Sequence, residues 1–121
     1  MDKKTYALLK LMEKRPAMWL SEVTLKSYDS FLMGYSCAIR EYKIKENFGI
    51  TFDFMEWTAN KLGYFESTAG WANMILASTI GLNPKEIRWE NYNTNVTKEQ
   101  HQNSVKKFYE LIDEYITEIK N

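Results

Sequence analysis

The sequence contains one cysteine and one histidine, and this scarcity excludes several kinds of site. With Cys37 alone, no disulfide bond can form within the chain. His101 has no second histidine near it, so a zinc site built from the usual histidine and cysteine ligands is not expected. The five glycines are dispersed and form no phosphate-binding loop. We therefore predict no metal site, no cofactor, no catalytic residue and no enzymatic activity.

An excess of one charge is also missing. The chain has 16 basic and 16 acidic residues, whereas a general nucleic-acid-binding protein normally carries a basic excess. Only the first 15 residues are locally basic, with five basic and two acidic side chains. A helical adaptor or regulator that contacts nucleic acid through this N-terminus is therefore an alternative function, although a solvated helix face explains the charges as well. The five cations are Lys3, Lys4, Lys10, Lys14 and Arg15.

Long apolar runs are absent as well. No segment approaches the length of a membrane span, and the N-terminus has no run of signal-peptide length, so we expect a cytoplasmic protein. Hydrophobic residues nevertheless make up 45% of the 121 residues, which is enough for one core. The length fits a single domain over residues 1–121.

What the sequence does have is apolar residues at helical spacing. A first helix is predicted over residues 3–14, and Pro16 ends it. Thr24 is the predicted N-cap of a second helix. Gly34 interrupts this helix, which predicts a close helix crossing, and Cys37 beside the apolar stripe is expected to be half-buried. The stripe consists of Tyr28, Phe31, Leu32, Tyr35, Ala38, Ile39 and Tyr42.

The middle of the chain is harder to assign. Lys43–Gly49 is predicted to be a loop. Residues 50–54 alternate between apolar and polar and allow a short strand, but a loop that leads into a third helix is preferred. Asp53 would cap that helix and Gly63 would end it.

Two further helices complete the pattern. Ser67 or Thr68 is predicted to cap a fourth helix that ends near Gly81, and residues 85–96 read as an irregular connection. Thr97-x-x-Gln100 is a capping box that opens a final helix. The sum is an all-α, single-domain bundle of about five helices.

Aromatic and acidic residues gather between positions 52 and 71. A surface of this kind suits the binding of a basic protein, because aromatic side chains anchor an interface and carboxylates speed the encounter. The alternative is that the aromatics face the core and the acids face solvent. The predicted partner-binding residues are Asp53, Glu56, Trp57, Tyr64, Phe65 and Glu66.

A Met18-Trp19-Leu20 cluster follows Pro16 and is too apolar to be left in water. We expect it to anchor the turn over residues 15–23 to the end of the bundle. A third interpretation of the tryptophans is a ligand pocket lined by Trp19, Trp57 and Trp71.

These segments also carry a resemblance to a family. Arg15-Pro16-Ala17-Met18-Trp19-Leu20, then Phe31-Leu32-x-Gly34-Tyr35, Trp57 and Gly70-Trp71-Ala72, resemble a pattern in small bacterial proteins. Many of those proteins look like immunity proteins of polymorphic toxin systems, including contact-dependent inhibition. The resemblance covers about residues 12–76. The chain departs from it at Ala17, Trp19 and Ser21, where the pattern has Gly, Tyr and Gly.

The resemblance implies a function without catalysis. An immunity protein binds one cognate toxin domain in the cytoplasm, with a stoichiometry of one to one, and occludes its active site or substrate face. The toxin is often a nuclease, and such domains are commonly basic. The resemblance provides no catalytic residue, and no membrane, nucleic acid or small-molecule substrate is expected as a direct partner.

Overall fold

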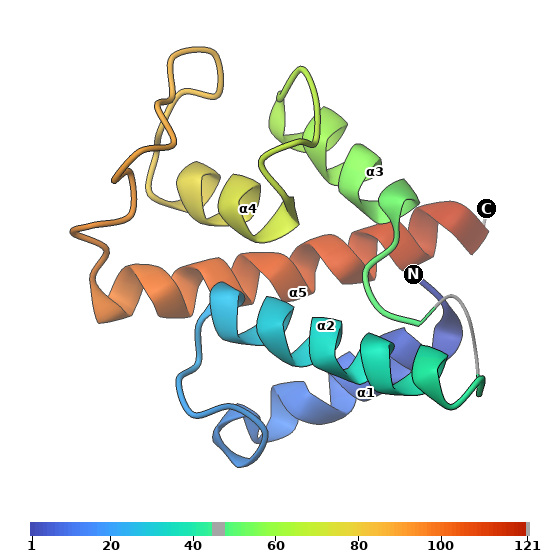
Figure 1. Ribbon diagram of the computed structural model, residues 1–121. Helices are drawn as coiled ribbons and strands as arrows, with labels where there is room; N and C mark the ends of the chain where they lie inside the picture. Colours follow the sequence, from blue (N-terminus) through green and yellow to red (C-terminus); the bar gives the residue numbers. More distant parts are fainter. Residues whose placement is uncertain (45–47, 121) are drawn as a thin grey trace.

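The computed structural model describes residues 1–44 and 48–120, so the predicted loop over Lys43–Gly49 lies partly outside the described residues (Figure 1). The prediction of an all-helical fold is confirmed. The described residues contain no strand, and the strand alternative for residues 50–54 is wrong. The elements are α1 (Lys3–Lys14), the short 3₁₀ helix η1 (Pro16–Met18), α2 (Leu25–Glu41), α3 (Phe52–Leu62), α4 (Trp71–Thr79) and α5 (Lys98–Lys120).

Side-chain caps fix the starts of three helices. At α1 the Asp2 carboxylate accepts a hydrogen bond from the Thr5 amide at 2.8 Å. Thr24 caps α2 as predicted, because its hydroxyl accepts from the Ser27 amide at 3.2 Å. The capping box of α5 is confirmed in both directions: the Thr97 hydroxyl accepts from the Gln100 amide, and the Gln100 side chain accepts from the Thr97 amide.

The predicted caps of α3 and α4 are wrong. Asp53 lies inside the first turn of α3, which begins one residue earlier after Thr51. Helix α4 begins at Trp71, directly after Gly70 with its φ of 90°, so neither Ser67 nor Thr68 caps it. Gly63 ends α3 as predicted, since its φ of 85° lies in the left-handed region that favours glycine.

Helix α5 runs along the whole molecule, and in the view of Figure 1 α3 and α4 lie above it and α1 and α2 below it. Phe108 of α5 is fully buried at the meeting point. Its ring stacks on Trp71 of α4 at 4.6 Å between centroids and lies 5.7 Å from Tyr28 of α2 and 6.5 Å from Phe54 of α3. One side chain therefore joins four helices.

Helix α1 is attached to the same core through a tyrosine pair. The Tyr109 hydroxyl of α5 donates to the Leu9 carbonyl of α1 at 2.7 Å, and it lies 2.9 Å from the hydroxyl of Tyr28. Burial raises the pKa of Tyr109 above the usual range, and the contact with Tyr28 adds to this. Nearer the C-terminal end of α5, Asp113 accepts from Tyr6 and Lys10 of α1.

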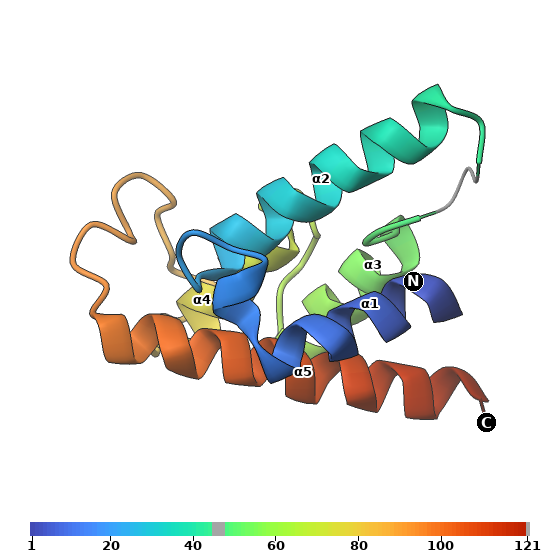
Figure 2. The same cartoon turned by 90° about the horizontal axis from the view of Figure 1, so that it is seen from below.

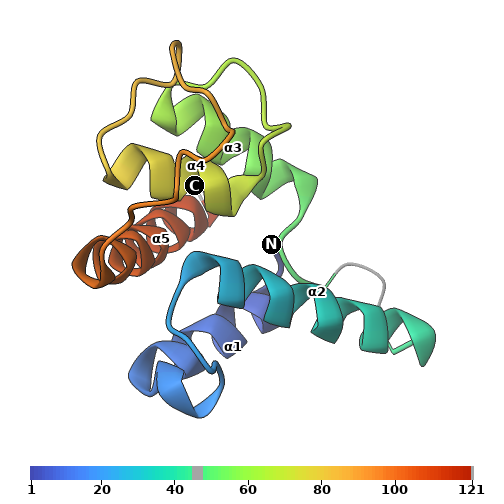
Figure 3. The same ribbon diagram turned by 60° about the vertical axis from the view of Figure 1, so that its left-hand side comes forward.

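The second half of α2 diverges from the bundle (Figures 2 and 3). Two predictions fail there. Cys37 is exposed rather than half-buried, and Gly34 marks no close crossing, because a Cβ added to it would meet no atom within 4 Å. Two residues of the predicted stripe, Tyr35 and Tyr42, are 41% and 77% exposed. The apolar stripe of α2 thus continues beyond the part of the helix that the core covers.

The turn before α2 is anchored by fewer residues than predicted. Leu20 is buried in the main core, but Met18 is 73% exposed. Trp19 is partly exposed and meets Phe31 edge to face at 6.1 Å between ring centroids. Only Leu20 fully serves as the anchor.

Tyr109→Phe is expected to lower the free energy of unfolding at neutral pH by about 1–2 kcal/mol, because the buried Leu9 carbonyl and Tyr28 hydroxyl each lose a partner. The same substitution should flatten the alkaline side of the stability profile. Since the pKa of Tyr109 is raised in the folded state, its contribution is complete below the unfolded pKa of about 10 and declines as the pH rises above it. Urea unfolding at neutral pH and above about pH 10 measures both effects. An alkaline decline equal to that of the unmodified chain would contradict this role.

Gly34→Ala is expected to raise the free energy of unfolding by about 0.5–1 kcal/mol, because alanine has the higher helix propensity and its Cβ would meet open space. The same urea titration checks this. A destabilised variant would show that Gly34 is closely approached by another part of the protein.

Candidate functional site

The six predicted partner-binding residues lie along α3 and the loop that follows it. Asp53 is exposed in the first turn of α3, while Phe65 and Glu66 are exposed in the loop beyond its last turn. The length of α3 therefore separates the two groups by about 15 Å. Glu56, Trp57 and Tyr64 lie between them and are half-buried or buried.

Trp57 packs mainly against α5. Its ring meets Tyr115 edge to face at 5.4 Å between centroids, and its indole N–H donates to Glu118 at 2.5 Å. Lys61, one turn on, lies 5.6 Å from the Trp57 ring and forms ion pairs with Glu114 and Glu118. These contacts dock α3 on the C-terminal half of α5.

Glu56 holds the loop between α3 and α4. Its carboxylate accepts a hydrogen bond of 2.5 Å from the hydroxyl of Ser67. The bond ties Ser67, which resembles a cap in the sequence, to α3, and α4 begins only after Gly70. A charge change at Glu56 therefore tests the loop as well as any partner contact.

Tyr64 and Phe65 are neighbours with opposite environments. Tyr64 is 8% exposed and stacks on Trp89 at 5.9 Å between centroids, whereas Phe65 is 100% exposed. The stack closes one side of a surface hollow of about 480 Å³, and Phe65 and Glu66 lie at its rim. Trp89 is also held by Tyr92, which meets it edge to face and bonds to Asn73 of α4.

Trp89 is a part of the site that the sequence does not indicate. It lies in the irregular segment after α4 that carries no helical or strand period, so nothing in the local sequence places it against Tyr64. It is 36% exposed beside Phe65 and Glu66, and it makes this end of the molecule an aromatic surface. We call the exposed parts of Phe65, Glu66 and Trp89 the loop surface.

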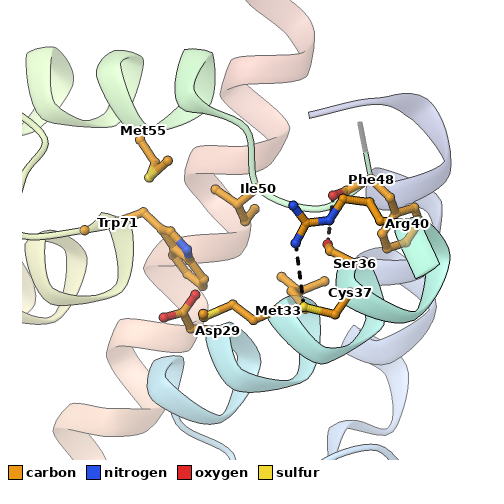
Figure 4. A pocket seen from close by; sticks show the side chains of 11 residues that line it. Asp29, Met33, Ser36, Cys37, Arg40, Phe48, Ile50, Met55 and Trp71 are labelled. Carbon is orange, nitrogen blue, oxygen red and sulfur yellow. Dashed lines mark hydrogen bonds between the residues drawn. The ribbon is translucent and has the colours of Figure 1, made fainter. Parts of the chain in front are cut away.

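A second hollow lies between α2 and the N-terminal ends of α3 and α4 (Figure 4). Its volume is about 410 Å³, and its lining is mainly apolar, with Met33, Ile50, Met55 and Trp71 facing it. Asp29 lies at one end beside Trp71. Burial raises the pKa of this carboxyl, and the nearby Trp71 indole N–H offsets part of the rise.

Arg40 lies at the other end of this hollow. Its guanidinium donates to the Cys37 sulfur at 3.6 Å (Figure 4). The hollow thus carries one acidic and one basic side chain at its two ends. Neither stands out in the sequence, in which both look like ordinary polar positions of an amphipathic helix.

The basic N-terminus is only partly available to a polyanion. Lys10 is engaged by Glu13 at 2.8 Å and by Asp113 at 3.2 Å. The other four cations, Lys3, Lys4, Lys14 and Arg15, are exposed.

The predicted pocket lined jointly by Trp19, Trp57 and Trp71 is not found among the described residues. Trp71 lines the hollow beside α2, Trp19 lines a different one near the start of α2, and Trp57 packs on α5. Among residues 1–44 and 48–120, no cluster of three His, Cys, Asp or Glu side chains could hold a metal ion. Within the same residues no helix combines the length and apolar character that a membrane span needs.

Comparison of the chain with protein-family models, curated proteins and solved structures gives no match. The resemblance to immunity proteins therefore stays a prediction that depends on the short motifs themselves.

Glu56→Lys is expected to lower the free energy of unfolding by about 1–2 kcal/mol, because the half-buried bond to Ser67 is lost. Glu66→Lys, the same change on an exposed carboxylate in the same segment, should stay within about 0.5 kcal/mol. Chemical denaturation of both variants makes the comparison. Equal stabilities would show that the Ser67 bond does not hold the loop.

Proposed function

We propose that this chain is an immunity-type inhibitor that binds one cognate toxin domain in the cytoplasm and occludes its active site or substrate face. The observation that supports this most directly is Phe65, a large aromatic side chain held wholly in solvent at the rim of a hollow. A side chain of this kind contributes nothing to the core. It gains its apolar burial only when another protein covers it.

The surroundings of Phe65 fit a protein partner. Trp89 is stacked on Tyr64 and therefore presents a rigid aromatic edge, which loses little conformational freedom on binding. Glu66 adjoins it and supplies a carboxylate for a basic partner, such as a nuclease domain. Asp53 adds a second exposed carboxylate at the other end of α3 and would extend the contact if the partner spans that helix.

The buried members of the predicted set have a different part in this proposal. Glu56, Trp57 and Tyr64 fix α3 and its loop against α4, α5 and Trp89. We infer that they position the loop surface and do not form its main contacts.

The first experiment is co-expression of this chain with the toxin-like product of a neighbouring gene. Co-purification of a one-to-one complex, together with rescue of growth in cells that express the toxin, would support the proposal. A chain that purifies alone and rescues no growth would overturn it.

The loop surface is tested on that complex with Phe65→Ala, which should weaken binding about 30-fold or more, as expected for an aromatic anchor. Phe52→Ala is the matched control, because Phe52 is 65% exposed at the opposite end of α3. Glu66→Lys should mainly slow association. Isothermal titration and stopped-flow binding measure these effects. Unchanged affinity in Phe65→Ala would place the contact elsewhere on the protein, even if the inhibitor function holds.

A further inference from the structure

One face of α2 begins in the packed first half of the helix, where Asp29 is half-buried beside Trp71, and continues into the projecting second half, where it is uncovered. Asp29, Met33, Cys37 and Arg40 follow one another at steps of four, four and three residues, which places them on one side of the helix. Met33 is 62% exposed and Cys37 and Arg40 are exposed, although they border the apolar hollow between α2 and α4. Figure 4 shows Met33 and Arg40 over this hollow. We call these four residues the α2 face.

Opposite charges lie at the two ends of the α2 face. Asp29 and Arg40 are eleven residues apart, or about three helical turns and 16 Å. Within residues 1–44 and 48–120 neither side chain forms an ion pair, and the guanidinium has only the weak acceptor Cys37. Each charge is therefore left without a counterion from the described part of the protein.

This charge pattern is complementary to itself. When two copies of α2 lie antiparallel about a two-fold axis between residues 34 and 35, Asp29 of each copy lies opposite Arg40 of the other. Met33 of each copy then meets the stretch around Ser36 and Cys37 of the other. A two-fold interface uses the same patch twice, so one register forms both ion pairs.

From this register we propose that the α2 face binds the same face of a second copy of this chain, so that the protein forms a homodimer. A partner with a single sign of charge would be repelled at one end of the face, and an anionic membrane would be repelled by Asp29. A second copy satisfies both ends. The zero net charge of the chain also means that two copies do not repel each other.

The proposal is independent of the toxin-binding function. The loop surface around Phe65 lies after α3, away from the projecting half of α2, so a dimer would leave it accessible (Figure 1). Dimerisation is measured on the purified chain alone, without any toxin.

Sedimentation velocity of the unmodified chain is expected to give twice the chain mass of 14.4 kDa at a concentration of about 100 μM. Arg40→Glu and Met33→Glu should each weaken dimerisation about tenfold or more, the first by repulsion from Asp29 and the second by placing a charge in the apolar centre. Lys106→Glu on α5 and Leu11→Glu on α1 are matched controls at exposed positions and should leave the dimer unchanged.

A mixing experiment tests the register. Asp29→Lys alone should be monomeric, because the introduced ammonium of each copy would face the guanidinium of Arg40 in the other. An equimolar mixture of Asp29→Lys with Arg40→Glu should form a heterodimer. The introduced ammonium of one copy would face the introduced carboxylate of the other, and the unmodified Arg40 and Asp29 would form the second pair. If Asp29→Lys does not fold beside Trp71, Asp29→Asn keeps the size of the side chain and should weaken the homodimer.

Each of the following results would contradict the dimer or its register. An unmodified chain that sediments at 14.4 kDa at about 100 μM overturns the proposal. So does a dimer that Arg40→Glu and Met33→Glu leave intact, since it would use another surface. A folded Asp29→Lys variant that gives no heterodimer with Arg40→Glu would overturn the antiparallel register.

Discussion

The stack of Phe108 on Trp71 is the contact on which the arrangement of the helices depends. Phe108 is fully buried and faces α2, α3 and α4 at once, so the positions of three helices are defined relative to one ring of α5. Because these aromatic contacts have preferred geometries, they restrict how the helices can slide against one another. Tyr109, the next residue, adds α1 through a directed hydrogen bond. The core is thus organised along α5. Aromatic contacts hold α2, α3 and α4 against it, and the hydrogen bond from the Tyr109 hydroxyl holds α1.

Much of this architecture is predictable because it depends on local signals. The capping box at Thr97 and the cap at Thr24 each work within a few residues of the chain, and the structure confirms both. Errors appear where a side chain has a distant partner. Ser67 looks like a cap for α4, but it donates to Glu56 eleven residues earlier, and the helix begins three residues later, after Gly70. No spacing rule in a single sequence reveals that choice.

The candidate site is predictable in a more limited way. Composition indicates an aromatic and acidic segment, but periodicity does not decide which ring faces outward. Tyr64 and Phe65 are adjacent and chemically similar, yet Tyr64 is buried, because it packs with Ala59 and Met74 and stacks on Trp89. Trp89 comes from a segment without regular period, so its position is not accessible to sequence reasoning. Which of the two rings is buried therefore depends on tertiary contacts that the local sequence does not reveal.

In helix α2 the sequence predicts the helix correctly but does not show how much of it is covered. Its apolar stripe is the strongest helical signal in the chain, and the stripe correctly predicts a helix. It does not predict that the helix is covered along its whole length, because the pattern is equally satisfied by a core and by a second protein surface. The first half contributes Tyr28 and Leu32 to the core, and the second half carries Tyr35 and Tyr42 into solvent. The apolar period of α2 therefore continues beyond the part of the helix that the core covers, and a single sequence does not show where that cover ends.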